Sequence, residues 1–134
     1  MKQRIIILAA LAGACGVIMG AFGAHALKDK LPETSLDIIR TGVLYLFVHT
    51  LAALLTTVIA DQSNYTGALR FTGISFLTGV ALFSGSLFII STSPLTGIHS
   101  TLIGVMTPLG GLFFIMGWLS FAWWAWRRSS VNQG

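Results

Sequence analysis

The most constraining feature of this sequence is a set of four long apolar segments, at positions 5–27, 38–60, 69–91 and 102–126. A helix needs roughly 20 apolar residues to cross about 30 Å of hydrocarbon, and each segment is near that length. The alternation of polar and apolar residues that marks the strands of a membrane barrel is missing from all of them. The sequence therefore predicts an all-α, polytopic membrane protein, in which residues 1–134 form one compact bundle of four transmembrane helices with short loops.

The composition also indicates a lipid environment. Only 9% of the 134 residues are charged, whereas a soluble domain usually carries about 25%. The net charge is +4, but the basic residues flank the apolar segments, as is usual in membrane proteins. No basic stripe with interleaved aromatic residues is present, so nucleic acid is excluded as a partner and the lipid bilayer is expected.

The first apolar segment has two alternative interpretations. Lys2 and Arg4 could begin a signal peptide that is cleaved near Ala24-His25-Ala26. The apolar stretch is longer than a typical signal peptide has, which favours a retained helix. The single cysteine, Cys15, allows no intrachain disulfide. Its preceding residues resemble a lipoprotein acylation motif but lack the usual large aliphatic side chain, so we expect Cys15 to be an apolar packing residue.

The distribution of lysine and arginine predicts the orientation in the membrane. With four spans, one side carries Lys2, Arg4, Arg70, Arg127 and Arg128, and the other carries Lys28, Lys30 and Arg40. Because the cytoplasmic side is enriched in basic residues, both termini are expected in the cytoplasm. The tryptophans at 123, 124 and 126 are typical of an interfacial anchor on that side.

The connections between the apolar segments are short and carry turn signals. In the first, at 28–37, Pro32 suits the first turn of a helix that runs into the second span, and Asp37 is spaced to pair with Arg40. The second is a polar turn at 61–68. The third, at 92–100, contains Ser93-Pro94 and Gly97, which predict a turn.

Small residues mark one face of the first helix. Gly13, Gly16, Gly20 and Gly23 are spaced three, four and three residues apart, which places them on the same side. Apolar burial cannot drive helices together in lipid, but close packing through small residues can. These glycines are therefore predicted to contact another helix. His25 lies roughly opposite them, near the outer boundary, where it is either an amphipathic side chain at the interface or part of a ligand or proton site.

Polar residues inside the later spans form a candidate polar or ligand site. His49 is deep in the second span on a stripe with Tyr45, and ionisable residues at that depth usually face a bundle interior or a wet cavity. It is either a neutral, hydrogen-bonded packing residue or a proton, metal or ligand site. Thr107-Pro108 should interrupt the fourth helix locally, to give a kink or a cavity lining. The candidate residues are His49, Tyr45, Ser84, Ser86, Thr107 and His25.

Several short motifs occur in an order that resembles a known family. They are Gly20-Ala21-Phe22-Gly23-Ala24-His25, Thr41-Gly42 with Tyr45, His49-Thr50-Leu51-Ala52, Leu82-Phe83-Ser84-Gly85-Ser86-Leu87, Thr107-Pro108 with Gly110-Gly111, and Gly117-Trp118. The ordered set resembles the YgdD/YwdK-like family of small bacterial inner-membrane proteins, a domain-of-unknown-function family. The resemblance implies four helices in the bacterial inner membrane and supplies no catalytic residues. The sequence has Leu46 where the family often has glutamine.

These observations favour a binding or structural protein over an enzyme. No carboxylate lies within a predicted span, no nucleophile and base are placed together, and no cluster has the spacing of a metal site. We therefore expect no catalytic residues, no metal and no cofactor. The first hypothesis is a bundle that binds a lipid, a small ligand, a membrane-protein partner or a second copy of itself. The alternative is a small transporter or channel-like permease with a polar path around His49.

Overall fold

The structure, a computed structural model, describes residues 1–60 and 67–131, with side chains as far as Arg128. Its elements are α1 (Lys2–Ala21), the π-helical turn η1 (Phe22–Ala26), α2 (Glu33–Ile59), α3 (Gly67–Gly79), the π-helical turn η2 (Val80–Ser84), α4 (Gly85–Thr96) and α5 (Thr101–Val131). Each π-helical turn continues the preceding helix. Four helical stretches are long and apolar enough to cross a membrane: Lys2–Ala26, Glu33–Ile59, Gly67–Thr96 and Thr101–Arg128. The predicted all-α fold with four membrane-spanning helices is confirmed.

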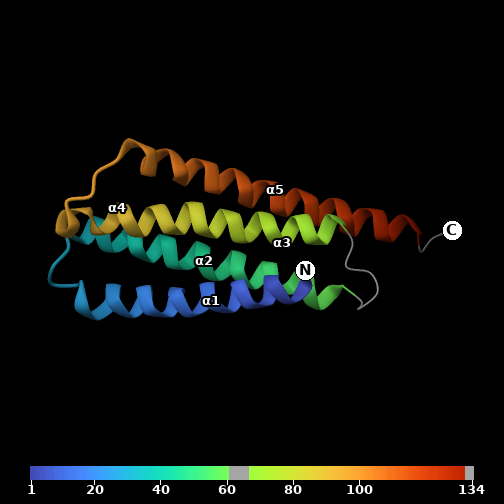
Figure 1. Cartoon of the computed structure of the whole chain (residues 1–134), viewed down its shortest axis with the longest axis horizontal. Helices are drawn as coiled ribbons and strands as arrows, with labels where there is room; N and C mark the ends of the chain where they lie inside the picture. Colours follow the sequence, from blue (N-terminus) through green and yellow to red (C-terminus); the bar gives the residue numbers. More distant parts are fainter. Residues whose placement is uncertain (61–66, 132–134) are drawn as a thin grey trace.

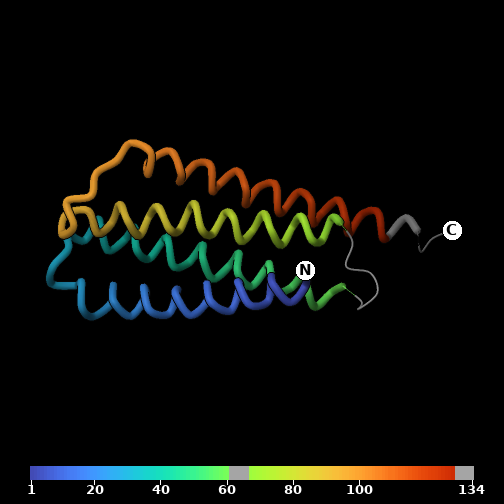
Figure 2. Tube along the Cα trace, viewed as in Figure 1, coloured from blue at the N-terminus to red at the C-terminus, as the bar shows by residue number. Residues whose placement is uncertain are grey.

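The spans lie side by side in chain order, from α1 to α5 (Figure 1). α1 packs mainly on α2, α2 packs on α3 and α4, and α5 packs mainly on α3 and η2. Of the most apolar stretch of each span, 17% is buried in the first and last spans, against 44% and 39% in the middle two. The middle spans therefore form the centre of the bundle. The backbone trace shows that α1 begins at the same end of the bundle at which α5 finishes (Figure 2).

The surface of the bundle is apolar. Val58, Leu102 and Leu119 are 77%, 76% and 66% exposed. A soluble monomer rarely exposes apolar residues over so much of its surface, and this outer face suits hydrocarbon.

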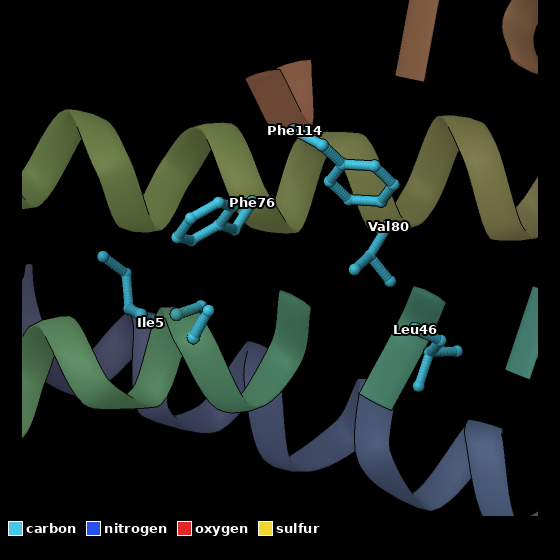
Figure 3. Packing of buried hydrophobic residues seen from close by; sticks show 7 residues of the cluster. Ile5, Leu46, Phe76, Val80 and Phe114 are labelled. Atoms are coloured by element: carbon cyan, nitrogen blue, oxygen red, sulfur yellow. The ribbon is translucent and has the colours of Figure 1, made fainter. Parts of the chain in front are cut away.

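Two apolar clusters hold the helices together. The larger cluster contains Ile5, Leu46, Ala52, Ala53, Phe76, Val80 and Phe114, so it joins all four spans. Figure 3 shows these side chains in the space between the helices. A smaller cluster of Leu31, Leu36 and Ile39 closes the end of the bundle where the first loop lies. The inner core therefore sits along α2 and the third span.

The first connection follows the sequence-based prediction in most respects. α2 runs without a break from Glu33 into the second span. Pro32 stands one position earlier than expected, at the N-cap, with an extended backbone. The predicted pair is confirmed, because Nη1 of Arg40 lies 2.6 Å from Asp37 Oδ1, and it also lies 2.7 Å from Glu33 Oε1. Most of the predicted polar turn at 61–68 lies outside the described residues.

The third connection differs from the prediction of a turn at 92–100. α4 continues through Ser93-Pro94 and ends at Thr96, and Gly97 then adopts a left-handed conformation with φ of 68°. Pro94 removes the backbone donor that would bond the carbonyl of Ile90, yet the helix continues for two more residues. The helix stops only at the residue that tolerates positive φ without a steric penalty. α5 is helical through Thr107 and Pro108.

Candidate functional site

His49 lies in the middle of α2 and has a partner for each ring nitrogen. Its Nδ1 is 2.8 Å from the carbonyl oxygen of Tyr45. Trp118 on α5 donates its indole N–H to Nε2 of His49 at 3.2 Å. An indole nitrogen only donates and a carbonyl only accepts, so His49 is neutral and carries its proton on Nδ1. Neither nitrogen is left for a metal or for proton transfer in this arrangement.

Aromatic rings from three spans surround this histidine. The ring of Phe114 stacks on it, with centroids 3.5 Å apart and planes within 13°. Tyr45 and Phe76 have ring centroids 5.6 Å from that of His49, and Trp118 is edge-on at 6.1 Å. His49 is only 5% exposed. It therefore joins α2, α3 and α5 at the centre of the bundle.

The third span and α5 interlock beside His49 through alternating glycines and phenylalanines. A Cβ atom on Gly79 would lie 2.5 Å from the ring of Phe114, and one on Gly117 would lie 2.6 Å from the ring of Phe76. Gly110 packs directly against the backbone of Phe83 in η2. Each glycine thus leaves room for a ring or a backbone of the opposite helix, which is how helices approach closely in lipid.

A separate polar contact lies further along the same interface. The hydroxyls of Ser86 and Thr107 are 2.7 Å apart. The Ser86 hydroxyl donates to the carbonyl of Phe83 at 2.9 Å, so Thr107 donates to Ser86. Both hydroxyls are therefore used in holding α4 against α5, just before Pro108.

The remaining candidate residues lie in different parts of the bundle. Tyr45 packs on Phe83 with ring centroids 4.7 Å apart, beside His49. His25 lies in η1 and is exposed, away from the other candidates. Of the four glycines on the first span, Gly16, Gly20 and Gly23 face side chains of α2, whereas a Cβ on Gly13 would meet nothing within 4 Å. Among the described residues, no group of three or more possible metal ligands occurs.

Ser84 is unlike the other candidate hydroxyls. It is fully buried at the end of η2, and its Oγ has no hydrogen-bond partner in the described part of the chain. It lies on the wall of a groove of about 640 Å³ between α1 and the third span. π-helical turns inside long helices often occur at functional sites, and η2 is one that borders a groove.

The groove is apolar along most of its length. Its lining comprises Met1, then Arg4, Ile5, Leu8, Ala12 and Cys15 of α1, Leu46 of α2, and Ile74, Leu77, Thr78, Val80, Ala81, Leu82, Ser84, Gly85 and Phe88 of the third span. The volume lies within the range of about 300–1,000 Å³ that is typical of small-molecule sites, which are also mostly apolar with a few polar groups.

Sequence reasoning missed this groove as a site. Arg4 was interpreted as a topology signal or as the start of a signal peptide, and Cys15 as an apolar packing residue, whereas both line the groove and Cys15 is exposed. The residues of α1 that line the groove recur at helical spacing, but their counterparts lie some 70 positions away in the sequence. Nothing in the sequence says which helix stands beside α1 on this face.

The comparisons with known proteins agree with this architecture. A family model described as a protein of unknown function (DUF423) matches residues 19–111. The chain is 38% identical to the UPF0382 membrane protein YwdK of Bacillus subtilis, covering 85% of this chain and 89% of the relative. It is 36% identical to a UPF0382 membrane protein of Haemophilus influenzae, over 98% of this chain and 100% of the relative.

The UPF0382 inner membrane protein YgdD of Escherichia coli is a further relative, 35% identical over 87% of this chain and 85% of its own length. No solved structure matches the chain. The predicted resemblance is thus confirmed, and the chain belongs to the DUF423 family of membrane proteins, a family of unknown function.

Proposed function

We propose that this protein is a non-catalytic inner-membrane bundle that binds a membrane lipid in the groove between α1 and the third span. The observation that carries the proposal is the groove itself, with its volume of about 640 Å³ and its largely apolar lining. A cavity of this kind on the side of a membrane bundle opens to hydrocarbon, so its natural occupant is an apolar chain.

The hydroxyl of Ser84 is buried beside this groove. An unpaired hydroxyl in an apolar interior costs about 1–3 kcal/mol. Serines elsewhere in the third span, such as Ser86 and Ser91, bond a backbone carbonyl in the preceding turn. Ser84 has no such bond in the described chain, but its hydroxyl is closed off from the groove, so binding there would rest on the apolar lining.

The surroundings of His49 favour binding over transport. A transport path through this region would need polar groups that are free to bind a substrate or a proton. Both nitrogens of His49 are engaged, and the ring is stacked on Phe114. The hydroxyls of Ser86 and Thr107 bond each other. The groove and the His49 cluster are therefore assigned different roles, as ligand site and packing centre.

The orientation follows from the charged residues at the ends of the bundle. Lys2 donates to the carbonyl of Ala60 at 3.2 Å, so the start of α1 and the end of α2 lie at the same end of the bundle. The more basic end of the bundle is assigned to the cytoplasm, with both termini. The weakly buried outer faces of α1 and α5 leave surface for a second copy or a membrane-protein partner.

Native mass spectrometry of the protein in a mild detergent tests lipid binding. The wild type is expected to retain lipid adducts, and Ala81→Trp, which fills the groove, is expected to lose most of them. Ala122→Trp on α5 is the matched control, because Ala122 is exposed but does not line the groove. Equal retention by both variants would contradict the proposal and would indicate annular lipid only. The same spectra report dimers and other partners.

A further inference from the structure

The two ends of the groove differ in charge. Arg4 is the one charged side chain among its lining residues, and it stands at the end where α1 begins. From Met1 to Cys15 the α1 wall is about 20 Å long, which is comparable with the roughly 15 Å of hydrocarbon in one leaflet. A lipid chain in the groove would therefore lie within a single leaflet, with its head at the level of Arg4.

The guanidinium of Arg4 is available to such a head. Within the described residues it makes no ion pair or hydrogen bond through its side chain, and the side chain is exposed. Lys2, by contrast, is bonded to the carbonyl of Ala60. The acidic residues that the structure describes, Asp29, Glu33 and Asp37, belong to the opposite end of the bundle.

The chemistry of a guanidinium defines the preferred head. Arginine donates through a planar fork that fits phosphate oxygens in a bidentate manner, and these charge-assisted bonds are stronger than neutral ones. A net negative head gains from the positive charge, whereas a choline group on the same phosphate opposes it. We propose that the groove selects an anionic phospholipid from the leaflet that holds the N-terminus, with Arg4 on its phosphate and one acyl chain along α1 and the third span.

This inference rests on the proposed function, because it names the class of lipid that the groove accepts. The test uses phosphatidylglycerol and phosphatidylcholine with identical dioleoyl chains, so that only the head differs. Both lipids are titrated together onto the purified full chain, and native mass spectra give the ratio of the two bound forms.

We expect the wild type to prefer phosphatidylglycerol by about tenfold, the factor given by one charge-assisted contact, and Arg4→Gln to lose that preference. Arg4→Lys, which keeps the charge without the planar fork, should retain part of it. Arg70→Gln is the matched control, since Arg70 is an exposed arginine at the start of α3 that does not line the groove.

The possible outcomes separate the two claims. If Ala81→Trp abolishes retention of both lipids but Arg4→Gln leaves the preference intact, the groove binds lipid and the role of Arg4 is wrong. The same conclusion follows if Arg70→Gln lowers the preference as much as Arg4→Gln. If Ala81→Trp changes nothing, the proposed function fails and this inference fails with it.

Discussion

Trp118 donates its indole N–H to Nε2 of His49 across 3.2 Å, and this bond joins the second span to the fourth. The two residues are 69 positions apart in the chain. Phe114, one turn before Trp118, stacks on the same imidazole. An ionisable residue deep in a membrane is thereby kept neutral and serves as the packing centre of the bundle.

Replacing His49 with alanine should destabilise the protein and leave lipid binding intact. The change removes the ring that stacks on Phe114, opens a cavity among the aromatic side chains and leaves the Trp118 N–H without its acceptor. Loss of a large buried side chain and of its hydrogen bond should lower the free energy of unfolding by about 2–4 kcal/mol. Thermal unfolding in detergent measures the effect, and lipid adducts lost at temperatures where His49→Ala is still folded would contradict the separation of the two sites.

Trp118→Phe tests the hydrogen bond apart from the packing. Phenylalanine keeps an aromatic ring against Phe76, whose ring centroid is 5.0 Å from that of Trp118, but it cannot donate to His49. The expected loss is about 1 kcal/mol, because hydrogen bonds between membrane helices contribute modestly. A loss as large as that of His49→Ala would show that ring volume matters and that the hydrogen bond does not.

Two neighbouring glycines on α5 should respond differently to the same substitution. A methyl group at Gly110 would overlap the backbone of Phe83, whereas one at Gly111 would meet nothing within 4 Å. Gly110→Ala is therefore expected to cost about 1–3 kcal/mol through overpacking, because a backbone cannot move aside as a flexible side chain can. Gly111→Ala should be close to neutral. Similar unfolding temperatures for the two variants would be incompatible with the close contact between α5 and η2.

The orientation can be checked with reporters fused after Gly134. A fluorescent protein that matures only in the cytoplasm should be bright when it is fused at this position. An alkaline phosphatase that folds only outside the cytoplasm should be inactive at the same position. The expectation follows from the five basic residues at the end of the bundle that holds the N-terminus, against three at the other end. Active phosphatase would reverse the assignment and would place the groove in the outer leaflet.

The sequence was sufficient to predict the spans, because the length of an apolar run directly reflects the thickness of a bilayer. It also predicted the pair of Asp37 and Arg40, which are near neighbours on one helix. The third connection was mispredicted, since Ser93-Pro94 resembles a turn signal but α4 continues through both residues to Thr96. Local signals thus predicted most of the helix ends, and failed at Pro94, which lies inside α4.

The candidate site was harder to predict, because it depends on which helices become neighbours. His49, Ser84, Ser86 and Thr107 were grouped by their polarity alone. In the structure His49 faces α5, Ser86 bonds Thr107, and Ser84 borders the groove beside α1. Ser84 and Ser86 are two positions apart, about 200° around a helix, so they face different neighbours. The partners of each hydroxyl therefore required the packed structure.

The most direct test of lipid binding in the groove is photocrosslinking with phosphatidylglycerol that carries a diazirine on its acyl chain, followed by peptide mapping. We expect adducts on Leu8, Ala12 and Cys15 of α1 and on Leu77 and Ala81 of α3 and η2, and we expect Ala81→Trp to abolish them. Adducts spread evenly over exposed residues such as Leu102 and Leu119 of α5, with no enrichment in the groove, would contradict the account.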